Sequence, residues 1–315
     1  MKALIQTMPS HWAILGVGAI GGLWASNFYR AQLDVELLIR NADQLALYKT
    51  KGLTLIKNGV TTNHLPHSLS LTSQPGPPIS HLLVTTKAHQ TLSALKQVKH
   101  RLTAKSQVLL LQNGLGNHKA VQELLPNSVI FCGITTEGAY RTTPNTIAHA
   151  GNGETWIGSE SKPLIALTQF KTLQHINRNC FWSNDITPRL WQKFAVNCAI
   201  NGLTVIHQCK NGDLLQKTKA YEQLKQLTAE IESVLTIKKI VLPSPLLEIS
   251  KTVLKQTAHN TSSMLQDFNA RQTLELDYLN LYLSQEADKL DLNLPHNNAL
   301  IQHINQMILT RNSER

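Results

Sequence analysis

The stretch "HWAILGVGAIGGLWA", residues 11–25, decides the fold that the sequence predicts. Gly16, Gly18 and Gly21 form a G-x-G-x-x-G pattern directly after the apolar run 11–15 and at the opening of a helical pattern. In such a strand–turn–helix unit the first glycine makes the tight turn, the second lets a pyrophosphate approach the backbone, and the third packs helix on strand. A chance match of glycines between two buried elements is the alternative. We predict a dinucleotide-binding loop that consists of Gly16, Val17, Gly18, Ala19, Ile20 and Gly21.

Apolar β-type runs alternate with helical patterns through most of the first half of the chain. This alternation predicts an α/β fold with a doubly wound, mostly parallel sheet. Residues 53–80 read instead as a small β excursion, and short strands between residues 139 and 157 are expected to complete that second sheet. From Pro188 onward the pattern is helical almost throughout. We expect two domains, one built on the sheet in residues 1–185 and one mainly helical in residues 186–315.

The positive charge of the chain is concentrated in its first half. Residues 1–130 carry 12 Lys/Arg against 4 Asp/Glu, whereas residues 131–315 carry 18 against 16. No block of five or six basic residues and no interleaved aromatic platform accompanies this charge, so we expect no nucleic-acid partner. A small polyanion bound by the first half would account for the charge equally well.

Neither membrane insertion nor metal binding is indicated. The longest apolar stretch, residues 12–25, has 14 residues, which is too short to cross a bilayer, and no clean signal-peptide cleavage site follows it. The four cysteines form no C-x-x-C pair and have no metal-ligand spacing with histidine. We therefore expect a cytoplasmic protein with buried, reduced thiols, no metal site and no membrane partner.

Arg40 ends the second β-type run, VELLIRN. A site that prefers NAD would carry Asp or Glu there to hold both ribose hydroxyls. A guanidinium suits a 2′-phosphate instead, because it can bind two of the oxygens at once. The sequence therefore favours NADP(H), with a solvated surface arginine as the alternative.

Two further polar residues follow the next strands. Lys87 comes directly after one apolar run and Asn113 after the next. Ligands in open α/β sheets gather at the carboxyl ends of the strands, so we expect both side chains to reach the nicotinamide end of the cofactor. Either residue could instead cap the following helix, and asparagine before glycine is common in turns.

Residues 191–204, "WQKFAVNCAINGLT", place a cation and two amides on one side of a predicted helix. Lys193, Asn197 and Asn201 are spaced four residues apart, and each such step drifts only about 40° around the helix. Their neighbours are mostly apolar, which argues against the alternative of a stripe facing solvent. Further along, four polar residues are candidates for the same pocket, although capping or solvation could explain each of them: Ser262, Ser263, Asp267 and Glu275.

The ordered set of motifs resembles the ketopantoate reductase (2-dehydropantoate 2-reductase) family from about residue 11 to about residue 300. The motifs are GVGAIGG (16–22), TKAHQ (86–90), QNGLG (112–116), GITTEGA (133–139), HAGNGETWIG (149–158), WQKFAVNCAINGLT (191–204), CKNGDL (209–214), SSMLQD (262–267) and LPHN (294–297). Departures are modest: residues 1–10 form an extension, His89 stands where some members carry tryptophan, and Gly202 where some carry proline.

The resemblance implies a Rossmann-type domain, a helical C-terminal domain, and NADPH-dependent reduction of ketopantoate in pantothenate biosynthesis. By matching positions, Lys193 is the proton donor and Glu275 the acidic partner near the reacting centre. The implied cofactor contacts are the glycine loop, Arg40, Lys87, Asn113, Ala139 and Glu275. The implied substrate contacts are Asn113, Lys193, Asn197, Asn201, Asn211 and Ser263.

Two rival functions stay open at this point. One is an NADP-dependent reductase of a different 2-keto or 3-hydroxy acid on the same fold. The other is a non-catalytic sensor that binds NADP(H). The sequence does not decide whether two copies of the chain associate as a homodimer.

Overall fold

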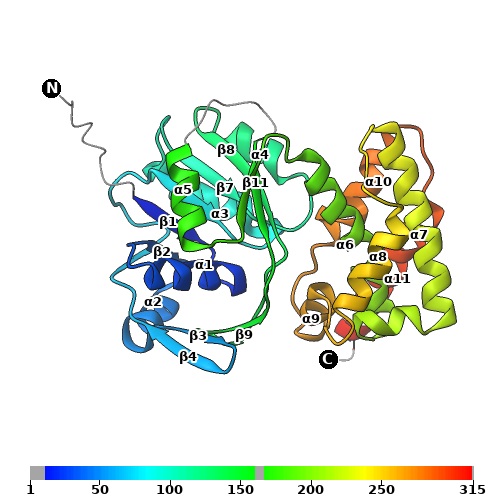
Figure 1. The fold of residues 1–315 in the computed structure, drawn as a ribbon, viewed down its shortest axis with the longest axis horizontal. Coiled ribbons are helices and arrows are strands. Elements are labelled where there is room, and N and C mark those ends of the chain that lie inside the picture. Colours follow the sequence, from blue (N-terminus) through cyan, green and yellow to red (C-terminus); the bar gives the residue numbers. More distant parts are fainter. Residues whose placement is uncertain (1–10, 160–166, 314–315) are drawn as a thin grey trace. The chain divides into compact units, whose positions relative to one another are not determined.

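The computed structural model describes residues 11–159 and 167–313, which form two compact units (Figure 1). One unit contains the chain up to Gln112 together with Asn117–Ile186. The other contains Thr187 onward and, in addition, the short loop Asn113–Gly116. The chain therefore leaves the sheet unit for four residues and returns to it before it enters the helical unit for good.

Within the described ranges, an eight-stranded sheet in the order β12-β11-β8-β7-β6-β1-β2-β5 forms the centre of the first unit. Neighbouring strands are parallel except for the antiparallel pair β11 and β8. This arrangement confirms the predicted doubly wound, mostly parallel sheet. Its strands are β1 (Trp12–Leu15), β2 (Glu36–Ile39), β5 (Ser68–Leu71), β6 (His81–Val84), β7 (Gln107–Leu110), β8 (Val129–Thr135), β11 (Thr155–Gly158) and β12 (Cys180–Ser183).

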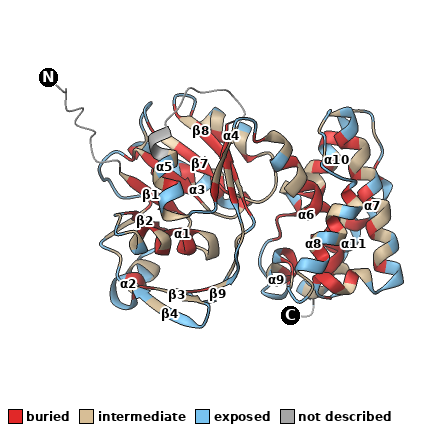
Figure 2. Ribbon diagram, in the orientation of Figure 1, coloured by how far each residue is buried: buried red, intermediate tan, exposed pale blue. Residues whose placement is uncertain are grey.

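Helices cover both faces of this sheet. Successive side chains of a strand point to opposite sides, and here the side chains on both sides are apolar and are buried by helices. On β1, Ile14 packs into the cluster that contains Trp24 and Phe28, whereas Ala13 and Leu15 pack into the cluster on the other face. The helices of this unit are α1 (Ala19–Arg30), α2 (Ala42–Lys51), α3 (Thr91–Val98), α4 (Asn117–Leu124) and α5 (Leu167–Ile176), with 3-10 turns η1 (Ala88–Gln90) and η2 (Lys99–Arg101). Figure 2 shows buried residues along β1, α1 and the neighbouring strands.

A second sheet lies over α1 and contains β3 (Leu53–Lys57), β4 (Val60–His64), β9 (Gly138–Thr143) and β10 (Thr146–Gly151). The predicted excursion is therefore confirmed for β3 and β4, and β9 and β10 complete it as expected. The prediction was wrong for β5 and β11, which both join the main sheet. Short apolar runs can pair with either sheet, and the choice depends on partners far away in the sequence.

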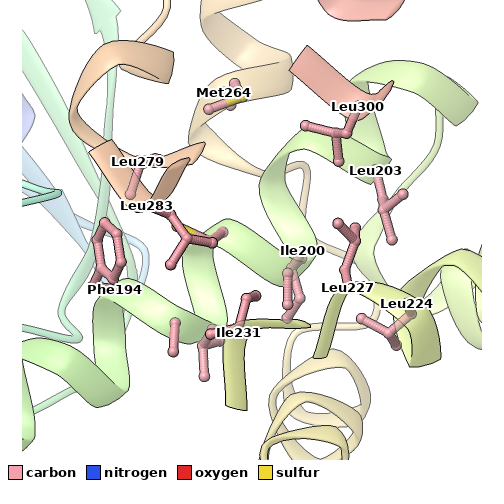
Figure 3. Packing of buried hydrophobic residues seen from close by; sticks show 14 of the residues in the cluster. Phe194, Ile200, Leu203, Leu224, Leu227, Ile231, Met264, Leu279, Leu283 and Leu300 are labelled. Atoms are coloured by element: carbon pink, nitrogen blue, oxygen red, sulfur yellow. The ribbon is translucent and has the colours of Figure 1, made fainter. Parts of the chain in front are cut away.

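The helical unit is built around α6 (Thr187–His207), which is buried along most of its length. Figure 3 shows Phe194, Ile200 and Leu203 of α6 in the cluster that also contains Leu227 and Ile231. The other elements are η3 (Asn211–Leu215), α7 (Thr218–Ile237), α8 (Leu246–Gln256), α9 (Ser263–Asn269), η4 (Leu276–Tyr278), α10 (Asn280–Asp288) and α11 (Pro295–Ser313). The helical pattern predicted from Pro188 onward is confirmed.

All four cysteines are buried and free, as predicted for reduced thiols. Across residues 11–159 and 167–313, no helix is long and apolar enough to cross a membrane. The same ranges contain no group of three or more His, Cys, Asp or Glu side chains arranged to hold a metal ion.

An ion pair inside the first unit joins β2 to η2. The Arg101 guanidinium donates to both carboxylate oxygens of Glu36, at 2.9 and 2.7 Å, and both residues are buried. Burial alone would raise the pKa of Glu36, but hydrogen bonds from His11, Arg101 and Ser70 outweigh it and lower the pKa to about 2. The carboxylate is therefore charged in the folded protein and depends on its partners.

We expect Arg101→Ala to lower the free energy of unfolding by about 3–5 kcal/mol, because it leaves a buried carboxylate without its guanidinium partner. Urea denaturation at pH 7 measures this loss, and the exposed Lys105→Ala is the matched control. In the wild type, the stabilisation from Glu36 is present above its unfolded pKa of 4.5 and is lost as the pH falls toward about 2. Equal stability of the two variants would contradict the assignment.

Candidate functional site

The glycine loop between β1 and α1 has the conformation that its motif predicts. Gly16 has φ +97°, and a Cβ there would lie 2.6 Å from the backbone nitrogen of Thr86. A Cβ on Gly21 would lie 2.5 Å from Thr85 Oγ1. At Gly18, by contrast, no described atom beyond its own chain neighbours lies within 4 Å of the Cβ position, and no side chain caps α1 there. The first and third glycines are needed for packing, whereas the second leaves the helix N-terminus open to a ligand.

The other predicted cofactor residues of the sheet unit follow strand ends. Arg40 is exposed directly after β2, and Lys87 is half-buried three residues after β6. Lys87 is the N-cap residue of η1, although its side chain makes no capping hydrogen bond there. Ala139 lies on β9, shortly after β8 ends. The exposure of Arg40 fits both a phosphate ligand and a solvated arginine, so its role stays a prediction.

A buried hydrogen-bonded pair lies beside Ala139 and was not predicted. Glu137 and His149 are joined by a 2.7 Å contact, with their side chains 9% and 3% exposed. Ala139 and His149 are paired across β9 and β10. The sequence analysis included Glu137 and His149 only as members of two matched motifs. It predicted no contact between them, because the spacing of two strands in the sequence does not show which of their side chains are paired.

The polar stripe on α6 is confirmed as one helix, and its lysine has a specific partner. Lys193 Nζ donates to Asn113 Oδ1 at 2.8 Å, which joins two predicted site residues that are 80 positions apart. Burial lowers the pKa of Lys193 to about 8, while the Glu275 carboxylate acts to raise it. Glu275 is itself buried, with 5% of its surface exposed. Asn197 is half-buried and Asn201 is buried, so the stripe does not face open solvent.

The Asn113–Gly116 loop is held by the segment that follows Glu275. Leu115 donates its backbone N–H to the carbonyl of Tyr278 at 3.0 Å. Gly114 has φ +80°, and a Cβ there would lie 2.8 Å from Tyr278 Cβ. A side chain at Gly114 would therefore push the loop away from Tyr278. This packing presents Asn113 to Lys193 and explains why the QNGLG motif needs a glycine after its asparagine.

Comparisons with known proteins match this chain over most of its length. The family model described as "Ketopantoate reductase PanE/ApbA" matches residues 12–162, and its C-terminal counterpart matches residues 185–308. A 2-dehydropantoate 2-reductase of Yersinia pestis is 35% identical over 298 residues, which cover 92% of this chain and 93% of that protein. One of Vibrio cholerae is 32% identical, with 92% and 95% covered.

The chain belongs to the ketopantoate reductase family. This family consists of oxidoreductases, so the predicted enzyme class is confirmed. The fold is shared with a PanE/ApbA family ketopantoate reductase from Ralstonia eutropha, with TM-score 0.87, 23% identity, and 97% and 100% of the two chains covered. It is also shared with D-mandelate dehydrogenase in complex with NADH and anilino(oxo)acetate, with TM-score 0.89, 22% identity, and 96% and 99% covered.

Three of the residues that the ketopantoate reductase resemblance implied lie close together: Asn113, Lys193 and Glu275. Asn211 is less simply placed. Its amide donates to Thr257 Oγ1 at 2.9 Å, and its buried Oδ1 has no hydrogen-bond partner among the described residues. The Asn211 amide group therefore joins η3 to Thr257, the C-cap residue of α8.

The two neighbouring serines of α9 have different surroundings. Ser262 caps the helix, because its hydroxyl accepts from the Leu265 N–H and also lies 2.6 Å from Thr204 Oγ1 on α6. The capping alternative is therefore correct for Ser262. Ser263, the first residue of the helix, is exposed and remains available for a ligand.

Proposed function

We propose that this protein is an NADPH-dependent 2-dehydropantoate 2-reductase, which reduces the C2 ketone of ketopantoate to give pantoate for pantothenate and coenzyme A synthesis. The observation that carries the proposal is the surroundings of Lys193. Its ammonium is held by Asn113 Oδ1, has a pKa that burial lowers to about 8, and is influenced by the buried carboxylate of Glu275. An amine with a pKa near neutrality can donate a proton and then be protonated again by solvent at physiological pH.

The residues of the sheet unit fit a dinucleotide. The open side of Gly18 leaves room for a pyrophosphate at the N-terminus of α1, where N–H groups and the helix dipole favour an anion. We assign Arg40 to the 2′-phosphate, and Lys87 and Ala139 to the nicotinamide end. Bound NADPH supplies the hydride that the reduction requires.

Lys193 is assigned to the reacting oxygen. Reduction of the ketone places negative charge on that oxygen, which a positioned cation stabilises and then protonates. Asn113 orients the ammonium through its hydrogen bond, and the carboxylate of Glu275 favours the charged form. This pair of neighbours keeps the donor protonated although burial disfavours its charge.

The substrate contacts are assigned to the polar groups beside Lys193. Asn197 and Asn201 follow it by one and two helical turns, so a rigid helix holds all three in register. Their amides can hydrogen-bond the carboxylate or the hydroxyl of ketopantoate and so fix which carbon receives the hydride. The hydroxyl of Ser263 is assigned to the same set, and Asn211 is retained as a weaker candidate.

We expect Arg40→Ala to lower the preference for NADPH over NADH at least about tenfold, since it removes a charge-assisted contact to the 2′-phosphate. Specificity constants for both cofactors measure this preference. Arg30→Ala, an exposed arginine at the end of α1, is the matched control. An unchanged ratio in Arg40→Ala would leave Arg40 as a surface residue.

The overall proposal is tested by mixing the protein with NADPH and ketopantoate and following the absorbance of the reduced nicotinamide. Rapid oxidation with ketopantoate but not with other 2-keto acids supports it. Oxidation with a different 2-keto acid favours the rival reductase, and NADPH binding without turnover favours the sensor. The proposal places the enzyme in the cytoplasm without a nucleic-acid or membrane partner.

A further inference from the structure

The LPHN motif at residues 294–297 has no part in the proposed chemistry, yet its asparagine is completely buried. Asn297 Oδ1 accepts a 2.8 Å hydrogen bond from the amide of Asn280, which is also completely buried. In return, the Asn297 amide donates to the backbone carbonyl of Asn280 at 2.9 Å. The two residues therefore bind each other reciprocally across the contact between α10 and α11.

Asn280 extends this pair to α6. Its amide also donates to the carbonyl of Cys198 at 3.0 Å. Cys198 follows Lys193 by five residues on the same helix, a rise of about 7.5 Å. Asn280 follows Glu275 by five residues. One hydrogen bond thus ties the segment that carries the carboxylate to the helix that carries the cation.

The far side of the pair is fixed as well. The backbone N–H groups of His296 and Asn297 donate to the two carboxylate oxygens of Glu230, at 2.7 and 2.8 Å. Glu230 lies on α7, so the start of α11 is held to a second helix. Where α11 passes α6, a Cβ on Gly202 would lie 2.7 Å from Leu300, which shows how closely these helices pack. Asn297 is therefore a rigid anchor for Asn280.

We propose that Asn280 and Asn297 are positioning residues that hold the Glu275 carboxylate at a set separation from the Lys193 ammonium. The proposal rests on the proposed function, in which Lys193 donates the proton. The same segment binds the Asn113 loop through Tyr278, so a shift of Glu275–Asn280 displaces both neighbours of Lys193. Electrostatic interaction between two charges falls with their distance, and a hydrogen bond is lost with small displacements.

A double-mutant cycle on turnover tests this role. We expect Asn280→Ala to lower kcat at least about tenfold in the wild-type background, and by a clearly smaller factor when Glu275 is already replaced by glutamine, because only the effect through the Asn113 loop then remains. NADPH binding, measured by fluorescence titration, should stay within about twofold. Additive losses in the two backgrounds, or no loss of kcat in either, would overturn the proposal.

One control variant and one substitute variant separate a positioning role of Asn280 from a general loss of protein stability. Thr228→Ala removes a buried hydroxyl that, among the residues the structure describes, bonds only to carbonyls of its own helix α7, at 2.9 and 3.0 Å, and it should keep the wild-type kcat. If Asn280→Ala does not fold, Asn297→Ser is put through the same cycle, because it removes the acceptor on which Asn280 depends. The ketopantoate reductase activity of the wild type is measured before any variant is made. If the wild type does not reduce ketopantoate, the proposed function is rejected, rather than the positioning role of Asn280.

Discussion

Lys193→Ala is expected to lower the turnover number at least about a hundredfold while NADPH binding is retained. The loss follows from removing the cation that we assign to the reacting oxygen, whereas the glycine loop lies in the other unit. Steady-state kinetics with saturating NADPH and ketopantoate measure the effect. Lys219→Ala, an exposed lysine of α7, is the matched control. Near-normal turnover in a folded Lys193→Ala variant would refute the role of Lys193 as donor.

The pKa of Lys193 also predicts how turnover depends on pH. A donor must be protonated, and the pKa of Lys193 is lowered to about 8 by burial, against the opposing effect of Glu275. Turnover in the reductive direction should therefore be constant below pH 8 and fall as the pH rises above it. The residual turnover of Lys193→Ala should lack this decline. Replacement of Glu275 by glutamine removes the group that raises the pKa, so the decline should begin at a lower pH.

Ketopantoate is expected to be preferred over 2-ketoisovalerate by at least about a hundredfold in kcat/KM. 2-Ketoisovalerate lacks the hydroxymethyl group that ketopantoate carries on C3, and Asn197, Asn201 and Ser263 provide more polar groups than a carboxylate and a ketone require. A site built to bond a hydroxyl rejects the analogue that lacks it, because its own polar groups are left without partners. Comparable specificity constants for the two acids would reject ketopantoate as the intended substrate and favour the rival reductase.

The adjacent serines of α9 provide an internal comparison for this preference. Ser263→Ala should reduce kcat/KM for ketopantoate more than for 2-ketoisovalerate, because its exposed hydroxyl is assigned to the substrate. Ser262→Ala should affect both substrates alike, since that hydroxyl caps the helix and contacts Thr204. It should also lower the free energy of unfolding by about 1 kcal/mol, the usual value of an N-cap.

The parts of the site that could be predicted are those with a local signature. The glycine loop combines a strand, a turn and a helix within a few residues, and the stripe of Lys193, Asn197 and Asn201 has the period of one helix. Both depend on backbone geometry that neighbouring residues determine. The bond between Lys193 and Asn113 has no such signature, because it joins residues 80 positions apart.

The same physical limit explains what was missed elsewhere. Glu36 and Arg101 are 65 positions apart, and Asn280 and Cys198 are 82 apart. Each pair is specified by how helices and strands pack, and a buried asparagine or arginine looks like a surface residue in a sequence. The assignment of β5 and β11 to the wrong sheet has the same cause, since the sequence of a short strand does not determine which other strand it pairs with.

The four residues Asn113–Gly116 have a consequence for how this enzyme can be recombined with its relatives. They are encoded within the first half of the gene but pack in the second unit, against Tyr278 and Tyr282. A chimera with a single crossover near residue 186 would therefore combine a loop from one parent with its docking surface from the other. Exchanges that keep the tetrapeptide with the helical half, by two additional crossovers, preserve the inherited match. The set of residues that must be inherited together for the helical unit is thus discontinuous along the chain.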